Sequence, residues 1–579
     1  MNILGISCFY HDAAAALIQD GMLIAAAEEE RFSRKKHDSE FPRLAIQFCL
    51  NKGGIRPEEL DYVVFYEKPF RKLDRILMMV LQTYPRSHQV FREAMIHWFT
   101  NKFWVKDILQ REFGIDEGKI LFSEHHLSHA ASAFFCSPFE KAAILTVDGV
   151  GEWSTATFGI GQASWNGHQA NEIQIKKEIY FPHSLGLLYS AFTAFLGFEV
   201  NEGEYKVMGM SAYGKPRFVE KIHKTIEVAS DGSFWLDMDY FDFSAQTRMP
   251  ITQKFIRLFG EPRIPESTFI LARDQHYADI AASIQLVTED VMVKLSEQLY
   301  KETKLDFLCI AGGVGLNGLA NAKILRNTPF KALYVHPAAG DSGGAIGAAL
   351  WAYHVVAGKP RRFVMQHCYW GEAYSDAQIR TELDRMGVQY QYFHREEDLL
   401  DLTASAIAEG EVVGWFQGRF EWGPRALGNR SILADPRRSQ MKEIVNQKIK
   451  FREPFRPFAP SVLVEKVEEY FDLPIGKQNL PMDFMLQIEL VRPEKQRLIP
   501  AVTHEDGTGR LQSVRQEHNP RYYRLIQRFE EITGVPVILN TSFNLKGEPI
   551  VNTASQAFRT FERGALERLV LGNCVITKK

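Results

Sequence analysis

The chain has 579 residues, of which 45% are hydrophobic and 24% are charged, and its formal net charge is −3. This composition is typical of a globular protein large enough for about two to four domains, and the weak negative charge argues against a protein dedicated to nucleic acid binding. No uncharged apolar run approaches the ~20 residues needed to cross a bilayer, so no membrane partner is expected.

The first predicted elements are strands joined by polar loops. Residues 2–8 form an apolar strand that ends in Phe9-Tyr10-His11-Asp12, and a turn at 19–21 leads into another strand at 22–27. Residues 141–147 repeat this design, because an apolar strand ends in Asp148-Gly149-Val150-Gly151 before a further strand-like run at 154–160. The recurrence predicts an α/β fold with a duplicated ribonuclease-H-like unit, in which each polar loop approaches phosphate.

Between the two copies, residues 84–110 are rich in Phe, Trp and basic side chains. An amphipathic helical insert is predicted, with its aromatic residues in a core or in a subunit contact that would make a homodimer. A wall that binds an acceptor substrate is the alternative interpretation.

Three histidines occur in Glu124-His125-His126-Leu127-Ser128-His129. On a helix, His125 and His129 project from the same face, whereas His126 points about 100° away. Two imidazoles together with Asp148, a carboxylate at the end of a buried strand, are typical of a divalent-metal site. The sequence therefore predicts a metal in this region.

Two glycine clusters lie between predicted strands and helices. A strand at 305–310 leads into a loop that contains Gly312, Gly313 and Asn317, and a strand at 332–336 leads into a loop with Gly340 and Ser342. Small residues let backbone amides approach a phosphate or a sugar at a helix N-terminus. No Gly-Lys-Ser/Thr follows, so neither is a Walker loop. Together they favour one nucleotide site beside the metal.

The composition changes at residues 357–362, where glycine, proline and basic residues occur together, and this is the predicted domain boundary. From 415 to 459, ten basic residues against four acidic ones are interleaved with glycines and aromatics. Guanidinium groups beside glycines favour a pocket for several phosphates over a solvated basic face. A later buried strand, 537–544, ends in hydroxyl and amide side chains that can hold a phosphate or a small carbonyl group.

The six cysteines never form a C-x-x-C pair, which excludes a thiol-based zinc ribbon and a thioredoxin-like motif. Reduced, buried cysteines are expected. The N-terminal apolar stretch lacks the basic start of a signal peptide and contains His11 and Asp12, so a cytoplasmic location is expected.

Ten short motifs are spread over nearly the whole chain: Phe9 to Asp12, Glu29-Glu30-Arg31-Phe32, Lys35-Lys36-His37, 124–133, Glu204-Tyr205-Lys206-Val207-Met208-Gly209, 312–317, 340–344, Trp422-Gly423-Pro424-Arg425-Ala426-Leu427-Gly428-Asn429-Arg430-Ser431, Arg456-Pro457-Phe458-Ala459-Pro460 and Leu539-Asn540-Thr541-Ser542-Phe543-Asn544. In these motifs and in their order, the chain resembles the NodU/CmcH family of O-carbamoyltransferases.

The resemblance implies two domains. Residues 1–358 would form a TsaD-like domain of the ASKHA fold that binds metal and adenylate and transfers the carbamoyl group. Residues 359–579 would form an α+β YrdC-like domain that converts carbamoyl phosphate and ATP, with Mg²⁺, to carbamoyl adenylate. The acceptor would be a hydroxyl of a small molecule, such as a sugar or a natural product.

The resemblance also implies roles for individual residues. His125, His129, Asp148 and Asp341 would bind the metal, with iron(II) the expected ion among divalent metals. His11 would be the transfer residue, and Lys36 would contact carbamoyl phosphate or its product. The expected nucleotide and phosphate contacts are Asp12, Lys206, Gly312, Gly313, Asn317, Gly340 and Ser342 in the first domain, and Arg419, Arg452, Arg510, Asn540 and Ser542 in the second.

His11 has an imidazole pKa naturally near neutrality, so we predict that it takes the proton from the attacking hydroxyl as a general base. Two other functions were considered. HypF-like carbamoylation of a protein thiol is disfavoured, because that family carries C-x-x-C zinc pairs and places its YrdC-like part first. A non-catalytic nucleotide sensor would not need both a second phosphate pocket and four metal ligands.

Overall fold

The computed structural model describes residues 1–100, 102–167, 169–243, 249–265 and 267–578. The chain separates into two compact units. The N-terminal unit comprises Met1–Glu29, His37–Met365 and Gly476–Gln478, and the C-terminal unit comprises Glu30–Lys36, Gln366–Ile475 and Asn479–Lys579. The main change of unit along the chain falls after Met365, near the expected boundary between residues 358 and 359.

Arg361 explains why the N-terminal unit extends past residue 358. Its side chain is only 2% exposed and donates to the backbone carbonyls of Phe134, Phe135, Ser137 and Phe139. These carbonyls lie at and just beyond the C-terminal end of α6, His125–Cys136. The backbone N–H of Met365 also donates to the carbonyl of Cys136, at 2.9 Å. The residues after the predicted boundary are thus anchored to the N-terminal unit.

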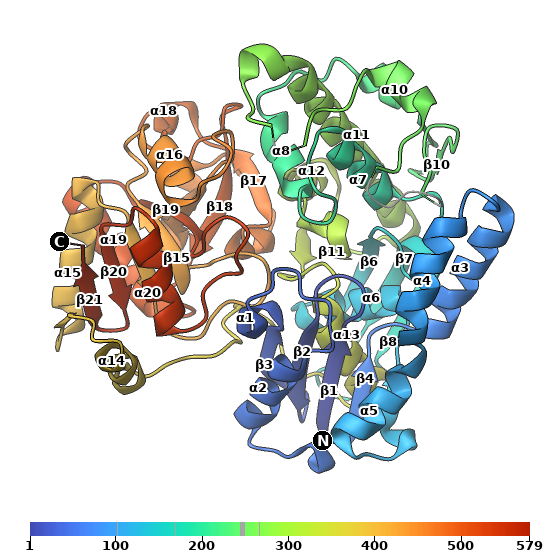
Figure 1. The fold of residues 1–579 in the computed structure, drawn as a ribbon, viewed down its shortest axis with the longest axis horizontal. Coiled ribbons are helices and arrows are strands. Elements are labelled where there is room, and N and C mark those ends of the chain that lie inside the picture. Colours follow the sequence, from blue (N-terminus) through green and yellow to red (C-terminus); the bar gives the residue numbers. More distant parts are fainter. Residues whose placement is uncertain (101, 168, 244–248, 266, 579) are drawn as a thin grey trace. The chain divides into compact units, whose positions relative to one another are not determined.

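Two five-stranded sheets of identical topology form the centre of the N-terminal unit (Figure 1). Each sheet has a first strand flanked on one side by two antiparallel strands and on the other by two parallel strands. The strands, in spatial order, are β3 (Met22–Glu28), β2 (Ala14–Gln19), β1 (Asn2–Ser7), β4 (Tyr62–Phe65) and β5 (Ile120–Phe122), and β8 (Glu172–Tyr180), β7 (Ser154–Gln162), β6 (Lys141–Val147), β11 (Phe307–Ala311) and β12 (Ala332–Val335). The predicted duplicated ribonuclease-H-like fold is confirmed by this repeated order.

Helices cover these sheets and position the polar loops. The helix α13, Gly343–Trp351, packs against both β1 and α6 and is composed almost entirely of small and aliphatic residues. Figure 1 shows the long α11 with α7, α8 and α12 grouped on one side of the second sheet. The principal remaining helices of the unit are α2 (Arg43–Gly53), α3 (Pro69–Thr83), α4 (His88–Thr100), α5 (Val105–Phe113), α7 (Leu185–Phe195), α8 (Glu204–Ser211), α10 (Gln253–Phe259), α11 (Leu271–Thr303) and α12 (Gly318–Asn327).

Most of the segment 84–110 is helical, as predicted. Residues 84–87 form a turn, α4 covers residues 88–100, and a short 3₁₀ helix at 102–104 leads into α5; residue 101 lies outside the described residues. Its aromatic side chains divide between two environments. Trp98 is 3% exposed, whereas Phe99 is 61% and Trp104 is 44% exposed. The core interpretation therefore applies to Trp98 and not to the exposed aromatics.

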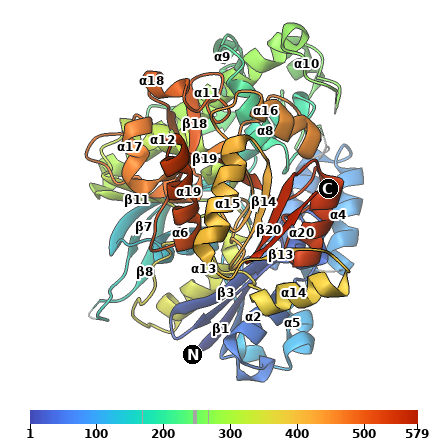
Figure 2. The same cartoon turned by 90° about the vertical axis from the view of Figure 1, so that its left-hand side faces the viewer.

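The C-terminal unit contains a nine-stranded mixed sheet with helices packed on it. Figure 2 shows α15, Glu396–Glu409, beside α19, Pro520–Thr533, and these two helices are in contact. The strands, in spatial order, are β13 (Gln391–Tyr392), β21 (Cys574–Thr577), β20 (Arg568–Leu571), β14 (Val413–Phe416), β15 (Arg430–Ala434), β19 (Val537–Ser542), β16 (Ala459–Leu463), β18 (Thr508–Val514) and β17 (Gln487–Leu490), and the longer remaining helices are α14 (Asp376–Arg385) and α20 (Ala554–Arg563). This second α/β layer architecture agrees with the predicted two-domain layout.

A short N-terminal segment belongs to the C-terminal unit. Residues Glu30–Lys36, which include the one-turn helix α1 (Glu30–Ser33), are part of it. Arg31 is 1% exposed and donates to the carbonyl of Gly423 at 2.7 Å. Arg34 donates to the carbonyls of Pro549 and Ile550 at 2.7 and 2.6 Å. Buried guanidinium groups bound to backbone carbonyls fix this segment in place.

Among the described residues, none of the helices has the combination of length and apolar character that crossing a lipid bilayer requires.

Candidate functional site

The helix α6 carries two of the predicted metal ligands, and polar groups cap both of its ends. At the N-terminus the carboxylate of Glu152 accepts the backbone N–H of His125 at 3.0 and 3.1 Å. At the C-terminus the guanidinium of Arg361 binds the last carbonyls. Negative charge at the first end and positive charge at the last complement the helix dipole. The positions of the two imidazoles are therefore fixed by a well-capped helix.

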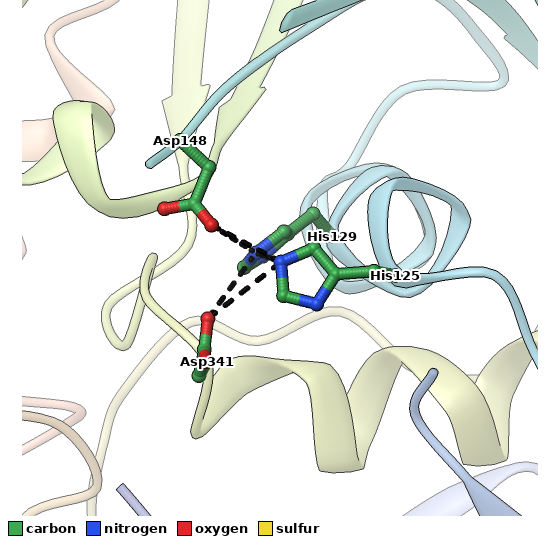
Figure 3. A group of neighbouring side chains, drawn as sticks. All are labelled: His125, His129, Asp148 and Asp341. Carbon is green, nitrogen blue, oxygen red and sulfur yellow. Dashed lines mark hydrogen bonds and ion pairs between the residues drawn. The ribbon is translucent and has the colours of Figure 1, made fainter. Parts of the chain in front are cut away.

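The four predicted metal ligands lie together and are buried (Figure 3). The Nε2 atom of His125 lies 3.1 Å from Asp148 Oδ2 and 3.7 Å from Asp341 Oδ1. The Nε2 atom of His129 lies 3.7 Å from both carboxylates and 3.1 Å from Nε2 of His125. One ligand atom from each residue lies within 4.8 Å of all the others.

Strand ends and helix starts explain this convergence. Asp148 directly follows β6, and Asp341 lies in the loop after β12, one residue before the Ser342 that begins α13 as its N-cap. Both strands run parallel to β11, so their C-terminal ends meet at the same edge of the sheet. The helix α6 packs against α13 and β6, which brings the imidazoles to that edge.

The electrostatics of the group favour a bound cation. Burial would lower the pKa of His125, but the hydrogen bond to Asp148 and the charge of Asp341 outweigh it and raise the pKa to about 9. The same imidazoles hold the pKa of the Asp148 carboxyl well below its usual range against burial. Two buried carboxylates thus require nearby positive charge. A divalent cation bound by two imidazoles and two carboxylates satisfies that requirement, so the donor set fits a metal.

His126 takes no part in this group. Its Nδ1 atom lies 2.6 Å from Thr146 Oγ1, and its Nε2 atom lies 2.7 Å from the carbonyl oxygen of Ser154. Burial and the two neighbouring histidines lower its pKa to about 3, so it is a neutral packing residue.

The first glycine loop is joined directly to the four predicted metal ligands, His125, His129, Asp148 and Asp341, which are called the metal group below. The backbone N–H of Gly313 donates to Asp148 Oδ1 at 2.8 Å. Gly312 has φ +91°, and a Cβ atom there would lie 2.2 Å from the carbonyl oxygen of Val147, so only glycine fits. Asn317 caps α12 by accepting the N–H of Ala320 and also exchanges hydrogen bonds with Gln285. Its side chain therefore already has a structural role, which the sequence did not indicate.

The second glycine loop is more open at its tip. A Cβ atom on Gly340 would meet nothing within 4 Å, whereas Ser342 is 6% exposed at the start of α13. The loop thus places Asp341 between an open position and a buried hydroxyl residue.

His11 and Asp12 form a second polar group of the N-terminal unit, together with His37. Asp12 accepts from His11 Nδ1 at 2.8 Å and from His37 Nδ1 at 2.9 Å. Nε2 of His11 lies 3.0 Å from the carbonyl oxygen of Asn201. Both ring nitrogens of His11 therefore face acceptors, which favours the imidazolium form.

The pKa of His11 differs from the near-neutral value expected from the sequence. Burial would lower it, but the Asp12 carboxylate outweighs burial and raises it to about 9. The pKa of Asp12 is correspondingly held far below its usual range. The unperturbed pKa assumed from the sequence was wrong, because Asp12 and Asn201 both stabilise the charged ring.

Lys206 lies on α8, with its ammonium 5.8 Å from the centre of the Phe198 ring. Its own helix begins next to the Asn201 loop, where Glu204 accepts the N–H of Asn201 at 3.0 Å. Lys206 thus lies in the segment 201–206, whose Asn201 contacts His11, and not in either glycine loop.

Lys36 lies in the C-terminal unit, although its position in the chain suggested the N-terminal one. It belongs to a cationic cluster that includes Lys450, Arg452 and Arg456. Burial, followed by repulsion from these two arginines and from Lys36, lowers the pKa of Lys450 well below its usual value. The Lys450 ammonium also bonds the side chain of Ser542, at 3.2 Å. The structure therefore brings Lys36, Arg452 and Ser542 to one place.

Lys450 was not among the predicted site residues, although it was one of the ten basic residues counted in that region. Its ammonium donates to Asn544 Oδ1 at 2.6 Å, a contact between segments 94 positions apart that no sequence pattern indicated. His37 was likewise not predicted as a partner of Asp12, because 25 positions separate the two residues.

The other predicted residues of the C-terminal unit lie in different surroundings. Arg419 donates to the carbonyls of Gly371 and Trp370, and Arg510 lies near His504. Asn540 is 1% exposed and donates to Gln512 Oε1 at 2.9 Å. Within the basic region Arg430 is fully buried against backbone carbonyls. Of the residues predicted to contact phosphate, Lys36, Arg452 and Ser542 thus lie around Lys450, and part of the basic composition is structural.

Comparison with known proteins agrees with this organisation. The family model described as "Carbamoyltransferase N-terminus" matches residues 2–350, and "Carbamoyltransferase C-terminus" matches residues 404–578. A protein of Synechocystis sp. called uncharacterized is 47% identical, with 100% of this chain and 97% of that protein covered. Nodulation protein NolNO of Sinorhizobium fredii is 37% identical, covering 99% and 79% respectively.

The 3'-hydroxymethylcephem-O-carbamoyltransferase of Amycolatopsis lactamdurans is 27% identical, with 97% of each chain covered. Both family models and the full-length relatives match in the order in which the two units occur. The chain belongs to the carbamoyltransferase family and is an enzyme of that class.

Proposed function

We propose that the protein is an ATP-dependent O-carbamoyltransferase. The C-terminal unit converts carbamoyl phosphate, ATP and water to carbamoyl adenylate, phosphate and pyrophosphate. The N-terminal unit then transfers the carbamoyl group to a hydroxyl of a small molecule and releases AMP. The observation that carries this proposal is the buried group of His125, His129, Asp148 and Asp341, joined to a glycine loop through the Gly313 amide.

The four side chains of this group would hold a divalent metal. Two imidazoles with carboxylates suit iron(II) among the ions available to such a site. When bound, the ion supplies Lewis-acid stabilisation of phosphate and carbonyl oxygens. The adjoining Gly312–Gly313 amides and the open space at Gly340 are where we place the adenylate.

His11 is the proposed general base of the transfer. To act, it must release the Nε2 proton that now faces the Asn201 carbonyl, and the acceptor hydroxyl takes the place of that carbonyl. Asp12 keeps the proton on Nδ1 and orients the ring. Because the pKa of His11 is about 9, the basic form is a minor species at neutral pH.

The Lys450 cluster is the proposed site of adenylate formation. Lys36, Lys450 and Arg452 concentrate positive charge where Ser542 and Asn544 supply polar side chains. Such a cluster neutralises several phosphate oxygens at once. Arg419, Arg510 and Asn540, which have other neighbours, remain proposed contacts of ATP or carbamoyl phosphate.

The acceptor is proposed to be a hydroxylated sugar or natural product, supported by the hydroxymethyl acceptor named for the cephem relative. With such an acceptor, the protein would act in the cytoplasm as an enzyme of secondary metabolism.

Pyrophosphate release from ATP tests the proposal. Purified protein is expected to release pyrophosphate only when carbamoyl phosphate is present. His11→Asn should retain this release and lose transfer to an acceptor. Release that is independent of carbamoyl phosphate would refute adenylate formation, whereas loss of both activities in His11→Asn would refute the role of His11. A screen of hydroxylated compounds with labelled carbamoyl phosphate would then identify the acceptor.

A further inference from the structure

A buried carboxylate lies beside the metal group without belonging to it. Glu67 follows β4 closely and has an exposed fraction of 0%. Its Oε2 atom accepts from Lys72 at 2.7 Å, and its Oε1 atom accepts from Lys102 at 2.8 Å. Both lysine side chains are buried, with 4% and 3% exposure. Two ammonium groups thus share one carboxylate in the protein interior.

The ring of His125 presents one nitrogen to the metal group and the other toward Glu67. Its Nε2 atom faces Asp148 and Asp341, as described above. Its Nδ1 atom is buried, and no group in the described part of the chain forms a hydrogen bond with it. The Oε2 atom of Glu67 lies 3.9 Å from this nitrogen.

The chemistry of a metal-bound imidazole specifies what Nδ1 needs. A neutral imidazole that gives its Nε2 lone pair to a metal carries its proton on Nδ1. A buried N–H without an acceptor is costly, so metal-bound histidines almost always donate this proton to a carboxylate, a carbonyl or water. A shift of about 1 Å in either side chain would bring the present separation to hydrogen-bond length.

We propose that Glu67 is a positioning residue that accepts the Nδ1 proton of His125 when Nε2 binds a divalent cation. This inference rests on the metal site proposed above. In this role Glu67 orients the His125 ring and keeps its proton on Nδ1.

The two lysines keep Glu67 able to accept. Their ammonium groups donate to its two carboxylate oxygens at 2.7 and 2.8 Å, and these positive charges favour the anionic form that accepts a proton. Lys72 belongs to α3, and Lys102 belongs to the short helix Lys102–Trp104 that precedes α5. The helical insert that follows β4 is thereby connected to a ligand of the metal group through a single ionised side chain.

The test is a titration of the full-length, metal-depleted protein with Co²⁺, followed by visible absorption. Wild-type protein is expected to bind one Co²⁺ tightly. Glu67→Gln should bind it about 10- to 100-fold more weakly, as is typical when a partner of a ligating histidine is removed, and the cobalt bands should shift. Glu124→Gln is the matched control. Glu124 immediately precedes α6, the helix that carries His125, but its side chain is 39% exposed and pairs with Lys68 and Arg71. It should change the affinity less than about 2-fold.

Glu67→Gln leaves two buried ammonium groups without a carboxylate and can unfold the unit. The double variant Glu67→Gln/Lys102→Met removes one charge of each sign and should show the same loss of Co²⁺ affinity, whereas Lys102→Met alone should retain most of it. If wild-type protein fails to bind Co²⁺, the metal site itself is refuted. If wild-type protein binds and a folded Glu67 variant binds equally well with an unchanged spectrum, only the role of Glu67 is refuted.

Discussion

Replacing Arg361 by methionine tests how α6, the helix that carries His125 and His129, is held in place. The guanidinium is 2% exposed and donates to four backbone carbonyls at the C-terminal end of α6. It also lies 4.3 Å from the centre of the Trp165 ring. Methionine fills much of the same space but donates no hydrogen bond, so the carbonyls lose a charged partner inside the protein.

The expected cost follows from these contacts. A hydrogen bond to a charged group contributes about 1.5–3 kcal/mol, and the bonds of one guanidinium are not additive. Leaving a buried acceptor without a partner costs about 1–3 kcal/mol, so the loss of several such bonds together is expected to cost about 3 kcal/mol. Because every ~1.4 kcal/mol is a factor of ten, amide exchange in peptides spanning α6 should accelerate by about 100-fold or more.

Hydrogen exchange followed by mass spectrometry measures this effect locally, so the C-terminal unit does not obscure it. Arg362→Met is the matched control, because Arg362 is the next residue and its side chain is exposed. That variant should leave exchange in α6 within a few-fold of wild type. Equal exchange in the two variants would refute the claim that Arg361 caps and stabilises the helix.

Three further predictions concern the chemistry. His129→Ala should weaken divalent-metal binding, measured by metal titration, by about 100-fold or more. It should preserve carbamoyl-phosphate-dependent pyrophosphate release, measured with radiolabelled ATP, and retained metal affinity would contradict the assignment of this ligand. Transfer by the wild-type enzyme should rise with pH toward about 9, because the neutral base forms only as pH passes the raised pKa of His11, and Asp12→Asn should move that midpoint down toward or below the ordinary value of 6.5. An unchanged midpoint across a measured pH profile would be inconsistent with Asp12 as the cause. Lys450→Met should lower pyrophosphate release by about 100-fold without altering metal affinity, and normal release would place adenylate formation elsewhere.

The sequence was most informative where local spacing determines geometry. The four-residue interval between His125 and His129 predicted one helix face, and Asp148 was expected at the end of a buried strand. The repeated strand and polar-loop pattern likewise predicted a duplicated ribonuclease-H-like unit. Asp341 came only from the family resemblance, because nothing in the local spacing connects its loop with the other three residues.

Distant contacts account for what the sequence could not provide. Lys36 lies in the C-terminal unit because Arg31 and Arg34 bind carbonyls far along the chain. The perturbed pKa of His11 depends partly on the Asn201 carbonyl, which is 190 positions away. Polar residue types also have more than one use. Asn317 and Asn540 were predicted to contact ligands, yet their side chains make internal hydrogen bonds to the helix start and to Gln512.

The position of residues 30–36 has a consequence for biosynthesis. Arg31 and its partner Gly423 are 392 positions apart, and Arg34 and Ile550 are 516 apart. A ribosome therefore makes this peptide long before the surface that receives it exists. A polypeptide starting at residue 366 would lack both arginines and fold with an incomplete second unit. Residues 30–36 are made early but dock late. The C-terminal unit is therefore complete only after a very long loop of the chain has closed.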